Sequence, residues 1–542
     1  MTDETHITDN IKQKPIIWTI SGSDCSGGAG IAADIKTGHA LGVEVCHLIT
    51  ANTVQNSTQL VSVNAVPVEL LQQQIDALAD DKKPNVIKIG LIANIEQMHW
   101  LATVIAKLKH KNSSLITVYD PVGQASVGGN FNALSPSTLT PLLKQIDIIT
   151  PNLAEAKILA TAKGDSKVLA KKISQKFGIN AVIVKGGHSE ENIADADTCV
   201  DVCVYQLNTI KQDNQDKTVE NISYQLNSPR IASHYSHGGG CTFASALAAF
   251  LAQGYLLRDA FTLSKAFINQ GLAASEQLST LNGHQYYGAF LQLSWPKQAQ
   301  YFPQVNDDLL LKYQDLPAFN SLTLYGDKLG LYPVIDSLYW LKRLLPLGLK
   351  IIQLRIKNLP QNELEQVIID AIALAKNYNT RLFINDYWQL AIKHGAYGVH
   401  IGQEDLANAD LAQIQHAGLR LGISTHGCYE FLLAQQLQPS YLAIGAIFPT
   451  KTKDMTGQIQ GIENLKQLLA LRLRQQDENT HIPIVAIGGI NLERAPEVIA
   501  TGVDSIAVVT AITKAENPEE AVEKLIAETI YSPTPPAEVE LN

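Results

Sequence analysis

The chain has 542 residues, of which 46% are hydrophobic and 17% are charged, and its formal net charge is −10 at pH 7. This length exceeds one ordinary hydrophobic core, so we expect two or three globular domains rather than a disordered polypeptide. The net negative charge, without any block of basic residues, argues against nucleic acid or an anionic membrane as a partner.

The six cysteines contain no C-x-x-C pair and no His/Cys cluster with the spacing of a zinc site. This pattern is typical of a reduced chain without disulfides. The first ten residues, MTDETHITDN, are polar and acidic, unlike a signal peptide, and no apolar run reaches the roughly 18 residues of a membrane-spanning helix. We therefore expect a cytoplasmic protein whose partners are small molecules.

Short apolar runs alternate with helical stretches from about residue 15 onward. A strand at 16–20 leads into a glycine-rich turn at 21–30 and then a helix at 31–41, which together form one βα unit. This alternation predicts a parallel sheet covered by helices on both faces. Residues 189–230, rich in Asp and Asn, are expected to form an irregular excursion. Further buried strands are predicted at 43–51, 86–91, 115–120, 146–150 and 181–185.

Polar residues gather where these predicted strands end. Asp120 closes one strand, Asn152 and Glu155 follow the next, and Lys185 closes a third. Any one of them alone would ordinarily be a capping or turn residue. Carboxylates, an amide and a lysine at successive strand ends instead predict a site for magnesium and a polyphosphate.

Three consecutive glycines, Gly238, Gly239 and Gly240, precede Cys241 and a helix-forming run at 243–252. Glycines at a helix N-terminus present bare backbone N–H groups and the positive end of the helix dipole to an anion. We interpret this segment as an anion cradle with a thiol at its rim. The alternative is a plain turn before a core helix with a buried cysteine.

Seven motifs follow one another in the first half: SGSDCSGGAGIAADIKT, TVQN, KIG, DPV, TPNLAEA, VKGGH and HGGGCT. Through them, residues 15–275 resemble hydroxymethylpyrimidine/phosphomethylpyrimidine kinases of the ribokinase-like fold. The family usually has Thr where Gly239 stands and Pro where Cys25 stands. In such kinases the glycine-rich segment holds the transferring phosphate, and Cys241 stands where related sugar kinases place an Asp base. A thiol at a helix N-terminus is expected to have a lowered pKa, so it suits the role of proton acceptor.

The same resemblance implies roles for residues elsewhere in the first half. Lys185 would face the ATP phosphates, and Asn152, Glu155 and Asp120 would lie near phosphate or magnesium. The aminopyrimidine would be surrounded by Gly22, Asp34, Thr53 and Gln55.

Residues 281–319 show no clear periodicity, and we expect them to connect two domains at 15–295 and 320–532. Eight strand-like runs then alternate with helical stretches. This predicts a (β/α)₈ barrel of the TIM type, in which chemistry takes place at the C-terminal ends of the strands. The predicted strands are 331–336, 350–357, 381–386, 398–402, 419–425, 441–448, 482–490 and 505–512.

Gln353, Arg355 and Lys357 alternate along one predicted strand and therefore point to the same face. In a barrel that face is the interior, where such side chains need an anionic partner; a solvated edge strand is the alternative. Asp386 closes the next strand and Asp405 follows the one after it. This carboxylate pair is suited to holding Mg²⁺ on a diphosphate.

A polar, cationic loop, PTKTK at 449–453, follows the sixth strand and suits a mobile phosphate clamp, although a solvated surface loop is the alternative. The motifs QLRIK, ND, HIGQED, GISTH, PTKTK and IGGI resemble those of thiamine-phosphate synthase over about residues 325–530. That family joins hydroxymethylpyrimidine diphosphate to thiazole phosphate and releases diphosphate. The resemblance implies that Asp386 and Asp405 bind Mg²⁺, that Gln353, Arg355, Lys357, Asn385 and Lys453 hold the pyrimidine diphosphate, that Thr450, Thr452, Gly489, Val509 and Thr510 receive the thiazole phosphate, and that Ser424 lies near the reacting centre.

Together the two resemblances predict a bifunctional enzyme of thiamine biosynthesis that uses ATP as phosphoryl donor and Mg²⁺ as cofactor. One alternative is a sensor of thiamine precursors that kept its pockets and lost turnover. Another is a related vitamin kinase, of the pyridoxal type, fused to a barrel like that of a thiazole tautomerase. The sequence leaves open whether the chain forms a homo-oligomer.

Overall fold

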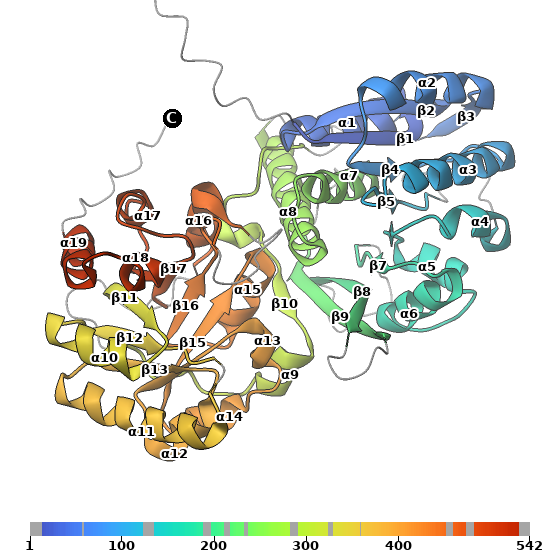
Figure 1. Ribbon diagram of the computed structural model, residues 1–542. Helices are drawn as coiled ribbons and strands as arrows, with labels where there is room; N and C mark the ends of the chain where they lie inside the picture. The colour runs from blue at the N-terminus through green and yellow to red at the C-terminus, as the bar shows by residue number, and fades with distance from the viewer. Residues whose placement is uncertain are drawn as a thin grey trace, which may run out of the picture. The chain divides into compact units, whose positions relative to one another are not determined.

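The computed structural model of the chain describes residues 14–56, 59–122, 135–187, 197–210, 217–231, 233, 237–281, 291–322, 329–357, 359–450, 459–472 and 482–530 (Figure 1). The chain divides into two compact units. The first comprises Met1–Pro296 with Gln300–Asp307, and the second Lys297–Ala299 with Asp308–Asn542. Within the described ranges, no helix is both long and apolar enough to cross a membrane.

The first unit is built on one sheet, which has ten strands among the described residues in the order β10-β9-β8-β7-β6-β5-β4-β1-β2-β3. The strands from β2 through β1 and β4 to β7 run parallel, and their carboxyl ends therefore lie along one edge. The strands are β1 Ile16–Asp24, β2 Glu44–Gln55, β3 Leu60–Ala65, β4 Val86–Ile89, β5 Ile116–Tyr119, β6 Ile148–Ile149, β7 Ala181–Val184, β8 Thr198–Ile210, β9 Lys217–Pro229 and β10 Gln304–Asn306.

The hairpin of β8 and β9 shows that the expectation of an irregular excursion at 189–230 was wrong. The two strands pair antiparallel along their whole length, from Thr198 opposite Pro229 to Ile210 opposite Lys217. β8 also pairs antiparallel with β7, and β3 with β2, so the sheet is mixed rather than wholly parallel. Val202, Cys203 and Val204 form a short apolar run in β8 and are all buried where the strand pairs with β7 on one side and β9 on the other.

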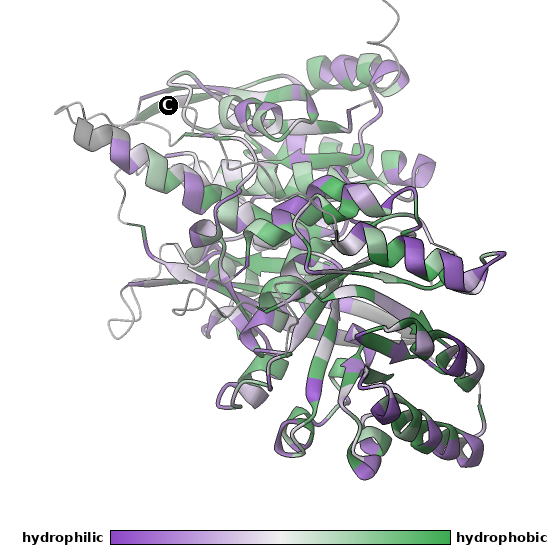
Figure 2. Cartoon of the chain, turned by 90° about the vertical axis from the view of Figure 1, so that its left-hand side faces the viewer, coloured by the Kyte–Doolittle hydropathy of each residue, from purple (hydrophilic) through white to green (hydrophobic). Residues whose placement is uncertain are grey.

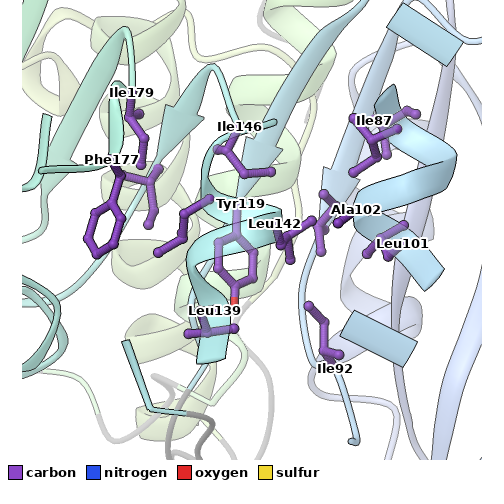
Figure 3. Packing of buried hydrophobic residues seen from close by; sticks show 14 of the residues in the cluster. Ile87, Ile92, Leu101, Ala102, Tyr119, Leu139, Leu142, Ile146, Phe177 and Ile179 are labelled. Carbon is purple, nitrogen blue, oxygen red and sulfur yellow. The ribbon is translucent and has the colours of Figure 1, made fainter. Parts of the chain in front are cut away.

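Helices cover both faces of this sheet. Odd and even residues of a strand point to opposite faces, so Trp18 and Ile20 join the large core beneath α2 to α6. Figure 3 shows part of that core, where Tyr119 of β5 packs among Leu139, Leu142 and other apolar side chains. On the other face α1 and α7 pack together and against β1. The helices are α1 Gly30–Ala40, α2 Val68–Asp81, α3 Ile95–Lys111, α4 Pro136–Leu143, α5 Leu153–Ala160, α6 Ser166–Phe177, α7 Gly239–Ala252 and α8 Leu257–Leu281.

The second unit is a closed barrel of eight parallel strands among the residues described, β11 to β18 in chain order. The predicted barrel is confirmed, although the strands end earlier than the apolar runs suggested. The strands are β11 Gly330–Ile335, β12 Ile351–Leu354, β13 Arg381–Asn385, β14 Gly398–Ile401, β15 Arg420–Thr425, β16 Tyr441–Ile444, β17 Ile484–Ile487 and β18 Ser505–Val508. The helices are α9 Asp308–Tyr313, α10 Leu338–Leu344, α11 Gln361–Asn377, α12 Trp388–His394, α13 Gln403–Leu406, α14 Leu411–His416, α15 Cys428–Gln436, α16 Gly461–Ala470, α17 Ala495–Ile499, α18 Thr510–Thr513 and α19 Pro518–Ile530.

Aromatic rings fill the interior of the barrel. Tyr332, Phe383 and Tyr441 meet edge to face, with ring centroids 5.1 to 6.2 Å apart. The ring of Tyr441 occupies the space that a side chain at Gly422 would need, since a Cβ there would lie 2.2 Å from Tyr441 Cζ. Figure 2 shows the complementary pattern on the helices, whose hydrophilic and hydrophobic segments alternate as expected for one packed and one open face.

Candidate functional site

The glycine-rich segment forms the N-terminus of α7, as the sequence predicted. Gly238 is the N-cap, and its φ of 83° lies in the left-handed region that favours glycine. A Cβ at Gly238 would lie 1.9 Å from the carbonyl oxygen of Gly28, so the two glycine-rich turns pack directly on each other. A Cβ at Gly240 would lie 3.2 Å from Asp120 Oδ2 and 3.3 Å from Lys185 Nζ. The first turn of α7 therefore faces the lysine and carboxylate predicted from the strand ends.

Asp24 and His237 tie these two turns together, and the sequence analysis assigned no role to either. Asp24 accepts hydrogen bonds from the N–H groups of Ser26, Gly28 and Ala29 at 2.8 to 3.0 Å, and its Oδ2 lies 2.9 Å from His237 Nε2. Burial alone raises the pKa of Asp24, but the hydrogen bonds, above all that with His237, outweigh burial and hold it well below its ordinary value. An ionised Asp24 thus fixes the conformation of the glycine-rich turn at 21–30.

Lys185 and Asp120 form an ion pair at the carboxyl edge of the sheet, with Nζ 2.7 Å from Oδ1. Although burial lowers it, the pKa of Lys185 is raised overall by Asp120 and then Glu155, so the ammonium is charged at neutral pH. Asn152 and Glu155 form a capping box at the start of α5: each side chain accepts the other residue's backbone N–H. Asn152 and Glu155 therefore also have a structural role, because they stabilise the start of α5.

The pKa expected for Cys241 was wrong. Burial raises the pKa of this thiol to about 11, and Asp34 and Asp120 add to the rise, whereas Lys88 and the backbone of Gly30 lower it. The favourable position at the helix N-terminus does not compensate for the burial of the thiol, to which the charges of Asp34 and Asp120 add. In this structure Cys241 holds its proton at neutral pH.

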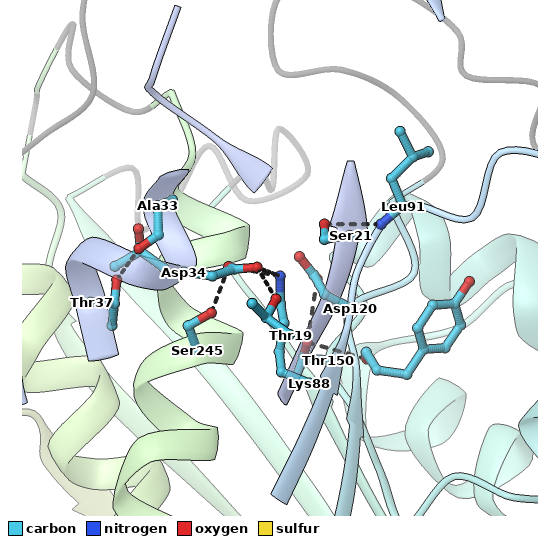
Figure 4. Close-up of polar contacts among 12 residues, drawn as sticks. Thr19, Ser21, Ala33, Asp34, Thr37, Lys88, Leu91, Asp120, Thr150 and Ser245 are labelled. Atoms are coloured by element: carbon cyan, nitrogen blue, oxygen red, sulfur yellow. Dashed lines mark hydrogen bonds and ion pairs between the residues drawn. The ribbon is translucent and has the colours of Figure 1, made fainter. Parts of the chain in front are cut away.

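Asp34 does not lie among the groups around the cavity, which corrects a second expectation. It is fully buried under the sheet, with both carboxylate oxygens 2.8 Å from Lys88 Nζ (Figure 4). Ser245 of α7 also donates to it at 2.6 Å, as does Thr19 of β1. On α1 this position faces β4, where the side chain of Lys88 alternates with those of Ile87 and Ile89 and so points to the opposite face. The pair and its two hydroxyl partners therefore join four elements, α1, β1, β4 and α7.

The other residues predicted for the first half line one cavity of about 470 Å³. Gln55 Oε1 is buried there without a hydrogen-bond partner among the described residues, as an atom that awaits a donor on a ligand would be. Cys25 donates to the carbonyl of the same Gln55 at 3.0 Å. The predicted residues brought together are Gly22, Thr53, Gln55, Asp120, Asn152, Glu155, Lys185, Gly238, Gly239, Gly240 and Cys241.

A second cavity, of about 590 Å³, opens at the carboxyl ends of the barrel strands. Arg355 and Lys357 line it although β12 ends at Leu354, because the alternation of side chains continues past the last ladder bond. Thr452 and Lys453, predicted for this site, lie outside the described residues. The predicted residues that line the cavity are Gln353, Arg355, Lys357, Asn385, Asp386, Asp405, Ser424, Thr450, Gly489, Val509 and Thr510.

Asp386 and Asp405 carry like charges close together in this cavity. Asp386 has a φ of 65°, a left-handed conformation that few residues other than glycine adopt. Burial and then the charge of Asp405 raise the pKa of Asp386, against the lowering effects of the Gly402 N–H, Arg355 and Asn385. A divalent cation would remove this repulsion, so the carboxylate pair fits the magnesium that the sequence predicted.

Gly488 and Gly489 follow β17 with φ values of 103° and 66°. A Cβ at Gly488 would lie 2.6 Å from Ala446 Cα, and one at Gly489 would lie 2.8 Å from Pro449 O, so neither position accepts a side chain. The short helix α18 begins at Thr510, directly after β18. Loops after the last two strands of a TIM barrel, together with a short extra helix, commonly bind phosphate.

His400 is a cavity residue that the sequence analysis did not single out, although it stands in the HIGQED motif. Its Nε2 lies 2.9 Å from Ser424 Oγ and its Nδ1 lies 2.7 Å from Tyr441 OH. Burial, followed by the charges of Arg355 and His426, lowers its pKa to about 3, so the ring is neutral at physiological pH.

Two family models match the chain, one in each unit. Phosphomethylpyrimidine kinase matches residues 24–286, and Thiamine monophosphate synthase matches residues 331–512. A thiamine-phosphate synthase from Yersinia pseudotuberculosis is 57% identical over 199 residues, which are 37% of this chain and 89% of that protein.

Two solved structures are similar to the first half. Pyridoxal kinase from Staphylococcus aureus, in complex with pyridoxal, is 28% identical with a TM-score of 0.39, and the match covers 48% of this chain and 88% of that one. Phosphomethylpyrimidine kinase from Clostridium difficile is 29% identical with a TM-score of 0.37, and the match covers 47% of this chain and 99% of that one.

Proposed function

We propose, from the premise that the chain belongs to the thiamine-phosphate synthase family and also carries a phosphomethylpyrimidine kinase domain, that its two cavities catalyse consecutive steps of thiamine biosynthesis. The chain is a bifunctional kinase and transferase. The first cavity phosphorylates hydroxymethylpyrimidine and then its monophosphate; the second couples the resulting diphosphate to thiazole phosphate. We assign these activities to residues 15–295 and 320–532.

In the first cavity, the residues that would hold the reacting groups are placed around the cradle. Gln55 Oε1 is available to an amino group of the pyrimidine. Backbone N–H groups of Gly239 and Gly240 and the ammonium of Lys185 would neutralise charge on the γ-phosphoryl group as it moves from ATP to the substrate hydroxyl. Magnesium supplies further charge neutralisation when bound, and Asp120 is the carboxylate that best fits it.

The hydroxyl loses its proton in this transfer, and Cys241 is the candidate acceptor. A thiol with a pKa of about 11 already holds a proton at neutral pH. The role of base therefore requires the bound substrate and cation to lower that pKa, as positive charge beside the sulfur would do.

In the second cavity, the carbon–oxygen bond of the pyrimidine diphosphate breaks and the thiazole nitrogen forms the new carbon–nitrogen bond. Diphosphate leaves with its electrons, so the site must mainly neutralise the departing charge and hold the two substrates in line. Arg355 and Lys357 would bind the diphosphate, and Asp386 with Asp405 would hold the magnesium ion on it. Gly489 and Thr510 would receive the phosphate of the thiazole.

The observation that carries this proposal is the presence of two chemically different cavities in one chain, one in each unit. The test is a coupled assay with hydroxymethylpyrimidine, thiazole phosphate and MgATP, in which thiamine phosphate is measured by fluorescence after oxidation. We expect product only when all components are present, and we expect added pyrimidine diphosphate to remove the need for ATP. Product that never forms from the diphosphate would refute the synthase assignment. Faster phosphorylation of pyridoxal than of hydroxymethylpyrimidine would refute the kinase assignment.

A further inference from the structure

A line of hydrogen-bonded side chains crosses the interior of the barrel and ends on Ser424. Gln353 Nε2 lies 3.4 Å from Tyr332 OH, which lies 2.8 Å from Tyr441 OH. Tyr441 OH lies 2.7 Å from His400 Nδ1, and His400 Nε2 lies 2.9 Å from Ser424 Oγ. Gln353, His400 and Ser424 line the cavity, whereas both tyrosines lie outside its lining, near the N-terminal ends of their strands.

The burial of the two tyrosines decides which way the hydrogen bonds run. Gln353 donates its amide N–H to Tyr332, so the Tyr332 proton goes to Tyr441. Tyr441 must then donate to His400 Nδ1, because its hydroxyl has one proton and is completely buried. With Nδ1 as acceptor, the neutral ring carries its proton on Nε2 and donates it to Ser424 Oγ. The proton of Ser424 is thereby left for the cavity.

If every hydrogen bond ran in the opposite direction, the Tyr332 hydroxyl would be left without an acceptor. Ser424 would donate to His400, His400 to Tyr441 and Tyr441 to Tyr332. The Tyr332 proton would then face the N–H group of Gln353, and a completely buried hydroxyl would have no acceptor. A buried donor without a partner costs about 1–3 kcal/mol, so the first direction is the stable one.

We propose that this chain of hydrogen bonds fixes the Ser424 hydroxyl as a donor to an acceptor atom of the bound pyrimidine diphosphate, with His400, Tyr441 and Tyr332 as positioning residues. The inference rests on the proposed synthase function and deepens it. Tyr441→Phe then acts at a distance. Without the tyrosine hydroxyl, no donor selects the Nε2–H tautomer of His400. The ring can then also populate the Nδ1–H tautomer, in which Nε2 accepts from Ser424 and the Ser424 proton turns away from the substrate.

The kinetic test is a double-mutant cycle on the synthase step, with pyrimidine diphosphate supplied directly. Ser424→Ala should lower kcat/KM by about 10- to 100-fold, the range for loss of a hydrogen bond to a charged group, and Tyr441→Phe should lower it by about 3- to 30-fold. The double variant should be no slower than Ser424→Ala, because Tyr441 acts only through Ser424. Multiplicative losses in the double variant would overturn the proposal.

Tyr397→Phe is the matched control. Tyr397 also packs in the ring cluster, 5.7 Å from Phe383 between centroids, but its buried hydroxyl has no hydrogen-bond partner among the described residues. Its loss should leave kcat/KM unchanged, and a fall equal to that of Tyr441→Phe would mean that both variants simply disturb packing. Far-UV circular dichroism and thermal unfolding of each full-length variant, compared with the wild type, report whether the barrel stays folded.

The tautomer of His400 is a readout that a purely structural role would not change. In ¹⁵N-histidine-labelled protein, with His400→Gln used to assign the signal, we expect the proton on Nε2 in the wild type and a measurable fraction of the Nδ1–H tautomer in Tyr441→Phe. A wild-type proton on Nδ1 would show that Ser424 donates to His400, the reverse of the proposed direction, and would overturn the proposal. A wild type that makes no thiamine phosphate would refute the proposed function instead. The tautomer measurement would still decide in which direction the hydrogen bonds between Ser424 and Tyr332 run.

Discussion

Replacement of Lys88 by Met should strongly destabilise the first unit. Lys88 and Asp34 are both fully buried, and both carboxylate oxygens lie 2.8 Å from Nζ. Burial lowers the pKa of Lys88, but Asp34 outweighs burial and raises it above its ordinary value, so the native pair is ionised. Loss of the lysine leaves a buried carboxylate with only the hydroxyls of Thr19 and Ser245, and breaking a buried pair in this way costs about 3–5 kcal/mol.

The assay is thermal or urea unfolding of the full chain. Because two units unfold in one chain, a single transition is not assumed; the kinase activity retained after heating identifies the transition of the first unit. A loss of 3–5 kcal/mol corresponds to a decrease in Tm of roughly 10 °C for a domain of this size. Synthase activity should survive heating as in the wild type.

The double variant Lys88→Met/Asp34→Asn is the control. It removes both charges and keeps groups that can hydrogen-bond to Thr19 and Ser245, so it should recover most of the lost stability. If Lys88→Met unfolds at the wild-type temperature, the pair is not a closed ionic contact. If the double variant is no more stable than the single one, the loss comes from packing rather than from an uncompensated charge.

Three further predictions concern the two cavities. Cys241→Ala should slow phosphorylation about 10²- to 10⁴-fold at saturating pyrimidine, while the pyrimidine Kd changes little because Gln55 recognises the ring; an unchanged rate would leave the step to the backbone cradle and Lys185. Gly489→Ala should raise the KM for thiazole phosphate at least about tenfold, because a side chain at a φ of 66° and 2.8 Å from Pro449 O must displace the backbone. Kinase activity should stay at the wild-type level, and an unchanged KM would place the thiazole phosphate elsewhere. Without Mg²⁺, the stability of the barrel should fall as pH rises through the raised pKa of Asp386, because the folded state then loses a proton that it holds more tightly than the unfolded chain does. Mg²⁺ should abolish this fall. Unfolding curves between pH 3 and 7 that do not respond to Mg²⁺ would contradict the carboxylate pair as the metal site.

The barrel and the parallel part of the first sheet were predictable because their strands are short apolar runs bounded by polar residues. The hairpin β8–β9 was missed for a different reason. Val202, Cys203 and Val204 form a buried apolar run in β8, but Asp and Asn occupy many positions of the surrounding segment and concealed this short run. The apolar run was visible in the sequence, but the polar composition of residues 189–230 favoured an irregular segment.

Other errors concern information that no local pattern contains. The helical periodicity of α1 places Asp34 on its inner face, but only the position of Lys88, 54 residues away, shows that it forms an ion pair there. The dipole at the start of α7 predicted a low pKa for Cys241, whereas burial of the thiol in the folded protein raises that pKa, and carboxylates from other elements add to the rise. Likewise, Tyr332 and Tyr441 meet across 109 residues of sequence, so the hydrogen bonds that orient Ser424 are visible only in the folded barrel.

Complementation between two variants tests most directly that one chain carries two independent active sites. Lys185→Met removes the ammonium beside the cradle, and Asp386→Asn removes one charge of the carboxylate pair, and the two residues belong to different units. From hydroxymethylpyrimidine, thiazole phosphate and MgATP, each variant alone should form almost no thiamine phosphate, and Asp386→Asn should accumulate pyrimidine diphosphate. An equimolar mixture should restore thiamine phosphate formation to a substantial fraction of the wild-type rate. A mixture as inactive as its components, with both proteins folded, would contradict the assignment of the two steps to separate sites.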